Sequence, residues 1–339
     1  MPSVMDLFNH REVLNYLQNR QYPVLLGEAL FPEVKRDSLE FDLIKGARRI
    51  PVVASVHAFD TEAEIGSREA SKQALALALI KRKLPLKEKD IIALENPRSQ
   101  AEQQYLMSEV YNDIDVLVAG VRGRVEVMRM EATANGTVTL AENGLSATID
   151  YGVPNNHKEV LSGTDLWTDP TSDPITQMQD WYATLGTKPK RVLTSGAVLA
   201  ALLRHPKVVG ALFGNNSARV ATRLDLNALL TQLELPTIAI YDDVYRKQKA
   251  DGSYEQLRYF PQNKFVMMPE GPLGETIYGP TAEEIRLMRD PSIQTQMIGK
   301  VLAMVYEEDV DPVSTWTKAV ATALPSFPAA DEVFQAQVI

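Results

Sequence analysis

The chain of 339 residues is long enough to bury a substantial core, in one large domain or in two to three smaller ones. Hydrophobic residues make up 45% and charged residues 23%, which is typical of a globular protein, and no run of about 18 apolar residues indicates a membrane span. Because cysteine is absent, disulfides, thiolate metal sites and a cysteine nucleophile are excluded. With 35 Lys and Arg against 44 Asp and Glu, the net charge of -9 disfavours broad contact with nucleic-acid phosphates.

The first forty residues predict an extended arm rather than a compact domain, because short helical stretches alternate with breaks at Pro23 and Pro32. The start of the chain lacks the basic and apolar layout of a signal peptide, so we expect a cytoplasmic origin. The apolar anchors of this segment need a surface to pack against: Leu14, Leu17, Leu25, Leu26 and Phe31.

A long two-stranded excursion is predicted next. A strand-like alternation from Ile50 to Val56 leads to an acidic tip, Asp60 to Glu64, which ends at Gly66. A second run, Leu75 to Leu79, then leads into the basic stretch Lys81-Arg82-Lys83. Arg48-Arg49 lies on the other leg, and we expect both basic clusters to pair with acidic patches on neighbouring subunits, since no aromatic residues accompany them as stacking platforms for nucleic acid would require.

An amphipathic helix of more than seven turns is the clearest element, at about 97–134. Asn96 is the expected N-cap, Pro97 the first helical residue and Asn135-Gly136 a left-handed stop. This length indicates a structural spine. Its apolar residues recur at steps of three and four: Leu106, Val110, Ile114, Leu117, Val121, Val125 and Met128.

After the spine, a hairpin around Asn143-Gly144 is predicted, with strands at 137–140 and 145–151. A turn-rich segment, 155–173, then precedes a mixed α/β region. The predicted elements are a helix at 174–186, a strand at 190–194, helices at 195–213 and 223–234, a strand at 237–245, a hairpin tip at 250–252, a strand at 264–268, and closing strands near 298–307, 313–323 and 332–338.

Motifs for nucleotide or hydrolytic chemistry are absent from the sequence. Neither G-x-x-x-x-G-K-[ST] nor G-x-G-x-x-G occurs, and Gly120 to Gly123 falls inside the spine, where small residues permit close packing. Ser195-Gly196 follows a strand and opens a helix, but Leu193 stands where a nucleophile turn has its first glycine. We therefore interpret Ser195 as a helix N-cap.

A metal site has equally little support. His10, His57, His157 and His205 are scattered and never spaced at i, i+4, so we interpret each as a surface or interface residue. The acidic string 307–311 lacks the loop glycine and distant glutamate of an EF-hand, which favours a solvated turn over a calcium site. The methionines at 128, 130, 267 and 268 are expected to fill the core. The sequence therefore predicts no catalytic, cofactor-binding or metal-binding residue and no cofactor.

Several short motifs, in order along nearly the whole chain, resemble the lambda-type, or E, family of tailed-phage major capsid proteins, which have the HK97-like fold. No single motif is as specific as a metal-ligand pattern. The motifs are Leu30-Phe31-Pro32, 48–54, Ser162 to Trp167, Asp169 to Pro174, Arg191 to Thr194, Ala197 to Leu203, Phe260 to Val266, Trp316-Thr317 and Pro325 to Asp331. The loop charges depart from the family pattern, so intersubunit pairs are not carried over.

The resemblance implies an α+β fold with four parts. They are an N-terminal arm at 1–44, an extended β-hairpin loop (E-loop) at 45–83, a peripheral domain with the spine helix at 84–155 and 306–339, and an axial domain at 156–305. It also implies a head protein without enzymatic activity, which forms pentamers and hexamers of an icosahedral shell around double-stranded DNA. The arm and loop reach over neighbouring subunits, and hinges are expected in the joins 135–136, 143–144 and 152–156.

The expected partners are further copies of the chain, a separate scaffolding protein, a portal and a decoration protein, with no membrane and no sequence-specific DNA binding. No polar helical preface that could be a fused scaffolding segment is visible before the arm, and the resemblance implies a separate scaffold. Assembly in the host cytoplasm and residence in the virion follow from the same resemblance. Two alternatives remain open at this point: another phage structural protein, such as a tail or decoration component, and a cytoplasmic α/β enzyme.

Overall fold

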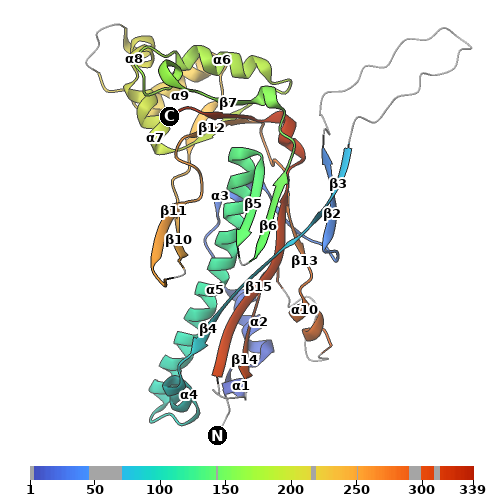
Figure 1. The fold of residues 1–339 in the computed structure, drawn as a ribbon. Helices are drawn as coiled ribbons and strands as arrows, with labels where there is room; N and C mark the ends of the chain where they lie inside the picture. Colours follow the sequence, from blue (N-terminus) through green and yellow to red (C-terminus); the bar gives the residue numbers. More distant parts are fainter. Residues whose placement is uncertain are drawn as a thin grey trace, which may run out of the picture.

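The computed structural model describes residues 4–45, 71–142, 144–214, 219–249, 251–289, 299–308 and 314–339. The molecule is elongated, with a long helix and sheet forming a body and a smaller α/β part at one end (Figure 1). The two parts have separate hydrophobic cores, one built around the long helix and the other around Trp167 and Trp181. This division matches the expected α+β class.

The body sheet is organised around the long strand β15 (Ser314–Ser326). Strand β4 (Ala78–Leu86) pairs antiparallel with it, as do β14 (Leu302–Glu308) and β13 (Glu275–Gly279), while β1 (Glu33–Lys35) pairs parallel with β13. The sheet thus gathers strands from the beginning, middle and end of the chain. The sequence predicted neither β13 nor its partner β1.

The spine helix α5 (Gln100–Asn135) lies across the body sheet and confirms the predicted apolar stripe. Val110, Ile114 and Val121 are at most 1% exposed. The predicted C-terminus is also confirmed, because Gly136 has a left-handed φ of 69° and donates its N–H to Ala132.

The predicted N-terminus of the spine is wrong. Asn96 instead ends a separate helix, α4 (Glu88–Glu95), and Ser99 caps the spine by accepting the N–H of Glu102 at 3.2 Å. Glu102 in turn accepts the N–H of Arg98 at 2.8 Å. A Ser-x-x-Glu sequence therefore overrode the Asn-Pro signal, since it satisfies donors at both its ends.

The N-terminal segment forms three short helices, α1 (Val4–Leu7), α2 (His10–Asn19) and α3 (Leu26–Leu30). Two of the expected anchors, Leu14 and Phe31, are 1% and 0% exposed, and they pack within the chain's own cores. In the subunit, this segment is therefore part of the body rather than an arm without a core.

The predicted excursion is a ribbon of β2 (Glu40–Lys45) and β3 (Ser71–Ala76), paired antiparallel with Lys45 opposite Ser71. The outgoing strand expected at 50–56, the clusters at 48–49 and 60–64, and Gly66 lie outside the described residues. Lys81 to Lys83, expected on the returning leg, belong instead to β4, where Lys83 is opposite Lys318 of the body sheet. The hairpin after the spine is confirmed as β5 (Thr137–Glu142) and β6 (Leu145–Asp150).

The α/β part has a five-stranded sheet of order β7-β16-β12-β8-β9. Its strands are β7 (Lys158–Val160), β16 (Phe334–Gln337), β12 (Lys264–Met268), β8 (Arg191–Thr194) and β9 (Thr237–Ile240). Its helices are α6 (Pro174–Thr184), α7 (Gly196–Arg204), α8 (Pro206–Phe213) and α9 (Arg223–Gln232). A hairpin of β10 (Val244–Gln248) and β11 (Tyr254–Arg258) extends from it beside the spine (Figure 1).

Two predicted elements in this part are divided. The helix expected at 195–213 is broken at His205, because Pro206 cannot supply a backbone donor and begins α8 instead. The strand expected at 237–245 ends at Ile240, and its second half opens the β10–β11 hairpin. Strand β12 coincides with the predicted strand at 264–268, and Met267 and Met268 are buried as expected.

The end of the chain crosses between the two sheets. Strand β14, most of which was expected in the axial domain, pairs with β15 of the body, and β16, expected in the peripheral domain, pairs with β12 of the α/β sheet. Strands β16 and β12 are distant in sequence, so local pattern could not pair them, whereas β14 and β15 are consecutive and the expected domain boundary at 305 divided β14 wrongly. Within the described residues, no single helix is long and apolar enough to cross a bilayer; only α7 and α8 pass that test as a pair, and they are bent by 63°.

Candidate contact surfaces

The outer face of the body sheet is only partly covered. The spine packs on the opposite face, where Thr317 and Ala319 are at most 1% exposed. On the outer face, Leu14 of α2 and Leu287, the last residue of helix α10 (Ala282–Leu287), pack over Val320. The rest of this face, which includes Trp316 and Lys318, is only partly buried in the subunit.

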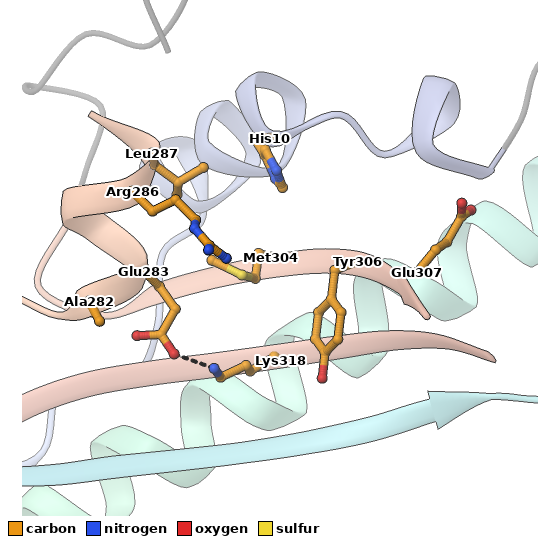
Figure 2. Close-up of a pocket in the computed structure, with 9 residues that line it drawn as sticks. All are labelled: His10, Ala282, Glu283, Arg286, Leu287, Met304, Tyr306, Glu307 and Lys318. Carbon is orange, nitrogen blue, oxygen red and sulfur yellow. Dashed lines mark hydrogen bonds and ion pairs between the residues drawn. The ribbon is translucent and has the colours of Figure 1, made fainter. Parts of the chain in front are cut away.

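A hollow of about 890 Å³ lies between α2, α10 and the strands β14 and β15 (Figure 2). Figure 2 shows the Lys318 ammonium directed toward Glu283, with which it forms an ion pair. Burial opposes ionisation of Glu283, but hydrogen bonds from Lys318 and the backbone and the charge of nearby lysines together lower the pKa of the carboxyl. The hollow is lined by His10, Ala282, Glu283, Arg286, Leu287, Met304, Tyr306, Glu307 and Lys318.

The same face continues beyond the hollow as an aromatic and cationic strip. The ammonium of Lys83 lies 3.6 Å from the ring centre of Trp316. Trp316 is opposite Tyr306 on β14, and Lys83 is opposite Lys318. Aromatic residues are enriched in protein–protein interfaces, whose rims are polar.

His205 and Ser172 form a pair that could suggest hydrolytic chemistry. The His205 Nε2 lies 3.0 Å from Ser172 Oγ and 2.9 Å from the Asp169 carbonyl. The Nδ1 atom accepts the N–H of Lys207 at 3.3 Å, so Nε2 carries the hydrogen and donates it. His205 therefore joins the turn 169–172 to α8 and is not placed to accept a proton from Ser172.

The interpretation of the histidines as surface residues is wrong for two of them. His205 is 3% exposed and His157 is 8% exposed, whereas His10 is partly exposed in the wall of the hollow. His57 lies outside the described residues. The signal for His205 was its place before Pro206, where its ring accepts a bond from the first turn of α8.

Ser195 is the expected N-cap, and its Oγ accepts the N–H of Val198 at 3.2 Å. Of the two glycines of the spine, Gly123 permits the expected close packing, because a side chain there would lie 3.0 Å from the hydroxyl of Tyr259, whereas at Gly120 the nearest atoms are those of Arg82 at 4.0 Å. The residues that the structure describes contain no group of three His, Asp or Glu placed to hold a metal ion. The acidic string is described only as far as Glu308, which ends β14.

A buried charge cluster on the spine was not predicted. Glu126 is fully buried and Arg129 is 1% exposed, although charged residues in a helix usually indicate a solvated face. Arg129 follows Val125 by four residues and so stands in the apolar stripe itself, which is the signal the sequence offered.

Glu126 is bound by three donors from three parts of the chain. Its Oε1 accepts the N–H of Gly27 at 2.8 Å and the hydroxyl of Tyr241 at 2.9 Å, and its Oε2 lies 3.4 Å from the Arg129 guanidinium. Burial raises the pKa of Glu126, although these three donors oppose the rise. The carboxylate thus joins α3, the spine and the end of β9.

Arg129 continues the cluster toward the body sheet. Its guanidinium donates to Glu33 of β1 at 2.8 Å and to the hydroxyl of Thr276 of β13 at 2.8 Å. Glu33 also accepts the Tyr278 hydroxyl at 3.0 Å and pairs with Lys300 at 3.0 Å. Burial of Glu33 acts to raise its pKa, but the hydrogen bonds of the two cations outweigh it and lower the pKa.

Comparison with known proteins gives one family and a set of solved structures. The model of the family described as phage major capsid protein E matches residues 11–338. A structure described as a prophage capsid protein of E. coli CFT073 has 14% identity and a TM-score of 0.62, with 97% of each chain covered. A phage-related protein of Bordetella bronchiseptica RB50 has 12% identity and a TM-score of 0.52, with 96% of each chain covered.

At these identities the two structures establish the fold alone, and the curated proteins contain no match. The family match, in contrast, covers nearly the whole chain, including the arm, the spine and both sheets. The chain therefore belongs to the phage major capsid protein E family and is a shell-forming subunit with the HK97-like fold.

Proposed function

We propose that this subunit assembles through pentamers and hexamers into an icosahedral shell that encloses double-stranded DNA, forming in the host cytoplasm and remaining in the virion. The observation that carries the proposal is the β2–β3 ribbon. Among the described strands, β2 and β3 pair only with each other, and residues 46–70 connect them. The base of the ribbon packs in the body core through Phe41 and Leu75, but an isolated two-stranded ribbon is marginally stable in water, so contact with a neighbouring subunit would stabilise the rest of it.

The four expected parts keep their roles in this proposal with revised limits. The loop comprises the ribbon and its connection, 40–76, because 78–86 belong to the body sheet. The peripheral domain comprises the spine and the body sheet, and the axial domain comprises the α/β sheet with its helices. The arm comprises any part of residues 4–35 that detaches from its own subunit and contacts a neighbour in the shell.

The outer face of the body sheet is the second proposed contact. Its hollow and the adjoining Trp316 strip offer half-buried apolar surface, whose removal from water is worth about 25 cal/mol per Å². Many such modest contacts hold a closed shell together, because a subunit must break all of them at once to leave. We expect no catalytic step at this surface.

Scaffolding, portal and decoration proteins are the proposed partners besides the chain itself. The net charge of -9 supports a wall that does not hold DNA tightly. Purified subunits should accordingly give no tight, salt-sensitive complex with double-stranded DNA in a gel-shift assay, and such a complex would contradict this part of the proposal.

Replacement of residues 46–70 tests the role of the ribbon. A short Gly-Ser linker should leave folded subunits that no longer close shells, as seen by electron microscopy and circular dichroism. A Gly-Ser linker of the original length is the matched control, because it keeps the reach of the loop and removes only its side chains. Normal icosahedral particles from the short-linker variant would refute the assignment, and small particles with measurable turnover would favour an enzyme instead.

A further inference from the structure

The buried carboxylate of Glu126 on the spine helix contacts both the N-terminal segment and the axial domain. Glu126 is 99 residues from Gly27 and 115 residues from Tyr241 in sequence, yet a single oxygen, Oε1, accepts hydrogen bonds from both. Two donors that share one acceptor influence each other, because loss of one hydrogen bond changes the strength and geometry of the other.

The fit at the N-terminal side is tight. A side chain at Gly27 would place its Cβ 2.4 Å from Glu126 Oε2 and 2.7 Å from Arg129 Cδ, so only glycine allows this approach. The next residue, Glu28, pairs with Arg122 one turn earlier on the spine, at 2.6 Å. Helix α3 is therefore seated on the spine by backbone and side-chain contacts together.

The fit at the axial side depends on tyrosines. Tyr241 immediately follows β9, and its ring stacks on that of Tyr259 with 6.2 Å between centres. Tyr259 in turn lies over Gly123 of the spine. The base of the β10–β11 hairpin thus rests on the same two turns of α5 that hold α3.

The charges of the cluster balance only while all of its members are in place. Glu28, Glu33 and Glu126 are matched by Arg122, Arg129 and Lys300, the last two of which contact Glu33. Departure of the segment that carries Glu28 and Glu33 would remove two of the three carboxylates that face the three cations, and it would leave Arg129 with Thr276 and Glu126 in a site that is almost fully buried. An imperfectly compensated buried charge is strongly destabilising, so the site would have to open.

We propose that Glu126 is a positioning residue that couples docking of the N-terminal segment to the seating of the axial domain on the spine. When the segment 26–33 is docked, the carboxylate holds Tyr241 and the axial domain in one orientation. When the segment leaves, that constraint is lost and the axial domain can change its angle. The coupling is a property of the single subunit, and its use in fitting one chain to different shell positions rests on the proposed function.

Tyr241→Phe provides the test, because it removes one hydroxyl on the axial side and touches nothing in the N-terminal segment. Amide hydrogen exchange is measured on the full chain as unassembled subunits, in peptides covering 22–33 and 238–248. We expect both peptides to exchange about tenfold faster than in the parent chain. Acceleration of 238–248 alone would overturn the coupling.

Glu126→Gln and a control complete the experiment. The glutamine amide offers one acceptor oxygen but turns a donor toward Arg129, so it should accelerate both peptides at least as much as Tyr241→Phe. Glu131→Gln is the matched control, because Glu131 lies on the same helix and accepts the N–H of Thr139 in β5 rather than a donor from α3 or from Tyr241. Equal acceleration of both peptides by Glu131→Gln would also overturn the proposal. None of these outcomes depends on whether shells form.

Discussion

The axial core and the spine junction are both fully buried, but they are held together by opposite means. The axial core is a cluster of rings, in which Trp167 lies 4.8 Å from Phe265 and Trp181 lies 5.2 Å from Phe334. The junction is a network of charges around Glu126 and Arg129. An apolar core tolerates small shifts without loss of pairing, whereas a charge network is satisfied in one arrangement only.

This difference indicates that the two regions have different roles, the ring cluster in stability and the charge network in orientation. The axial domain has a ring cluster of its own, although Leu193, Val266 and Met268 of its sheet pack in the body core, and in our proposal the junction determines where this domain sits. Buried ion pairs contribute little net stability when compared with apolar replacements, but they cost much when one partner is lost. A network of this kind is therefore suited to fixing an orientation rather than to strengthening the fold.

Trp167→Ala is expected to have the largest effect on stability. It removes a ring that is 1% exposed and leaves a cavity, which should lower the free energy of unfolding by about 3–5 kcal/mol. Because no titrating group is involved, we expect the loss to be the same from pH 5 to pH 8 in urea denaturation. Trp316→Ala, at the half-buried outer face, is the control and should cost less. The indole N–H of Trp167 bonds the amide of Gln177, whereas that of Trp181 bonds the carboxylate of Glu159, so a loss that varied with pH would show that Glu159 contributes to this core.

Of the axial core, the sequence predicted the strand at 264–268 and the burial of Met267, but not the cluster of rings, and of the junction it predicted nothing. Strand β12 was identified from a short apolar run after Pro261, and the spine from apolar steps of three and four. These signals are local, and burial follows from them directly. The junction depends on partners about a hundred residues apart, and the sequence around Glu126 contains no pattern that predicts contact with Gly27 or Tyr241.

The errors in element limits have a similar origin. The start of the spine and the break at His205 have local signals, Ser99-x-x-Glu102 and Pro206. Both were missed, the first because Asn96-Pro97 also fits a helix start, and the second because the apolar pattern runs on through 195–213. The placement of β16 in the α/β sheet had no local signal, whereas β14 pairs with the strand that directly follows it. The absence of a predicted active site followed from missing motifs and needed no knowledge of the fold.

Glu33→Gln is expected to show the pH dependence that the axial core lacks. The pKa of Glu33 is lowered from its usual value of 4.5, so its contribution is present at neutral pH and is lost as the pH falls through the lowered value. At pH 7 the variant should be about 1.5–3 kcal/mol less stable than the parent. The difference should shrink below about pH 4.5 in a series of denaturation curves.

Glu275→Gln is the control for this series. Glu275 pairs with Arg36 at 3.1 Å, but both side chains are about half exposed, so its loss should be small at every pH. A Glu33→Gln effect that persisted unchanged at acid pH would mean that packing, rather than charge, accounts for its role.

Gly27→Ala tests the close approach of α3 to the spine. The added methyl group would lie against Glu126 and Arg129, and we expect a loss of about 1–3 kcal/mol from overpacking. Gly120→Ala is the matched control, because its Cβ would meet nothing nearer than Arg82 at 4.0 Å. An alanine there should stabilise the helix by about 0.5–1 kcal/mol. Equal effects of the two substitutions on the melting temperature would show that glycine at 27 serves no steric purpose.

Lys207→Ala is expected to have the smallest effect, and it separates an ion pair from its surroundings. Lys207 lies 3.1 Å from Asp173, nearly the distance between Arg129 and Glu33, but the side chains of Lys207 and Asp173 are 45% and 41% exposed. Water screens such a pair, so the loss should stay below about 1 kcal/mol and should vanish in 1 M salt. A loss as large as that of Glu33→Gln would show that the distance between the charges, and not their burial, sets the strength of the junction.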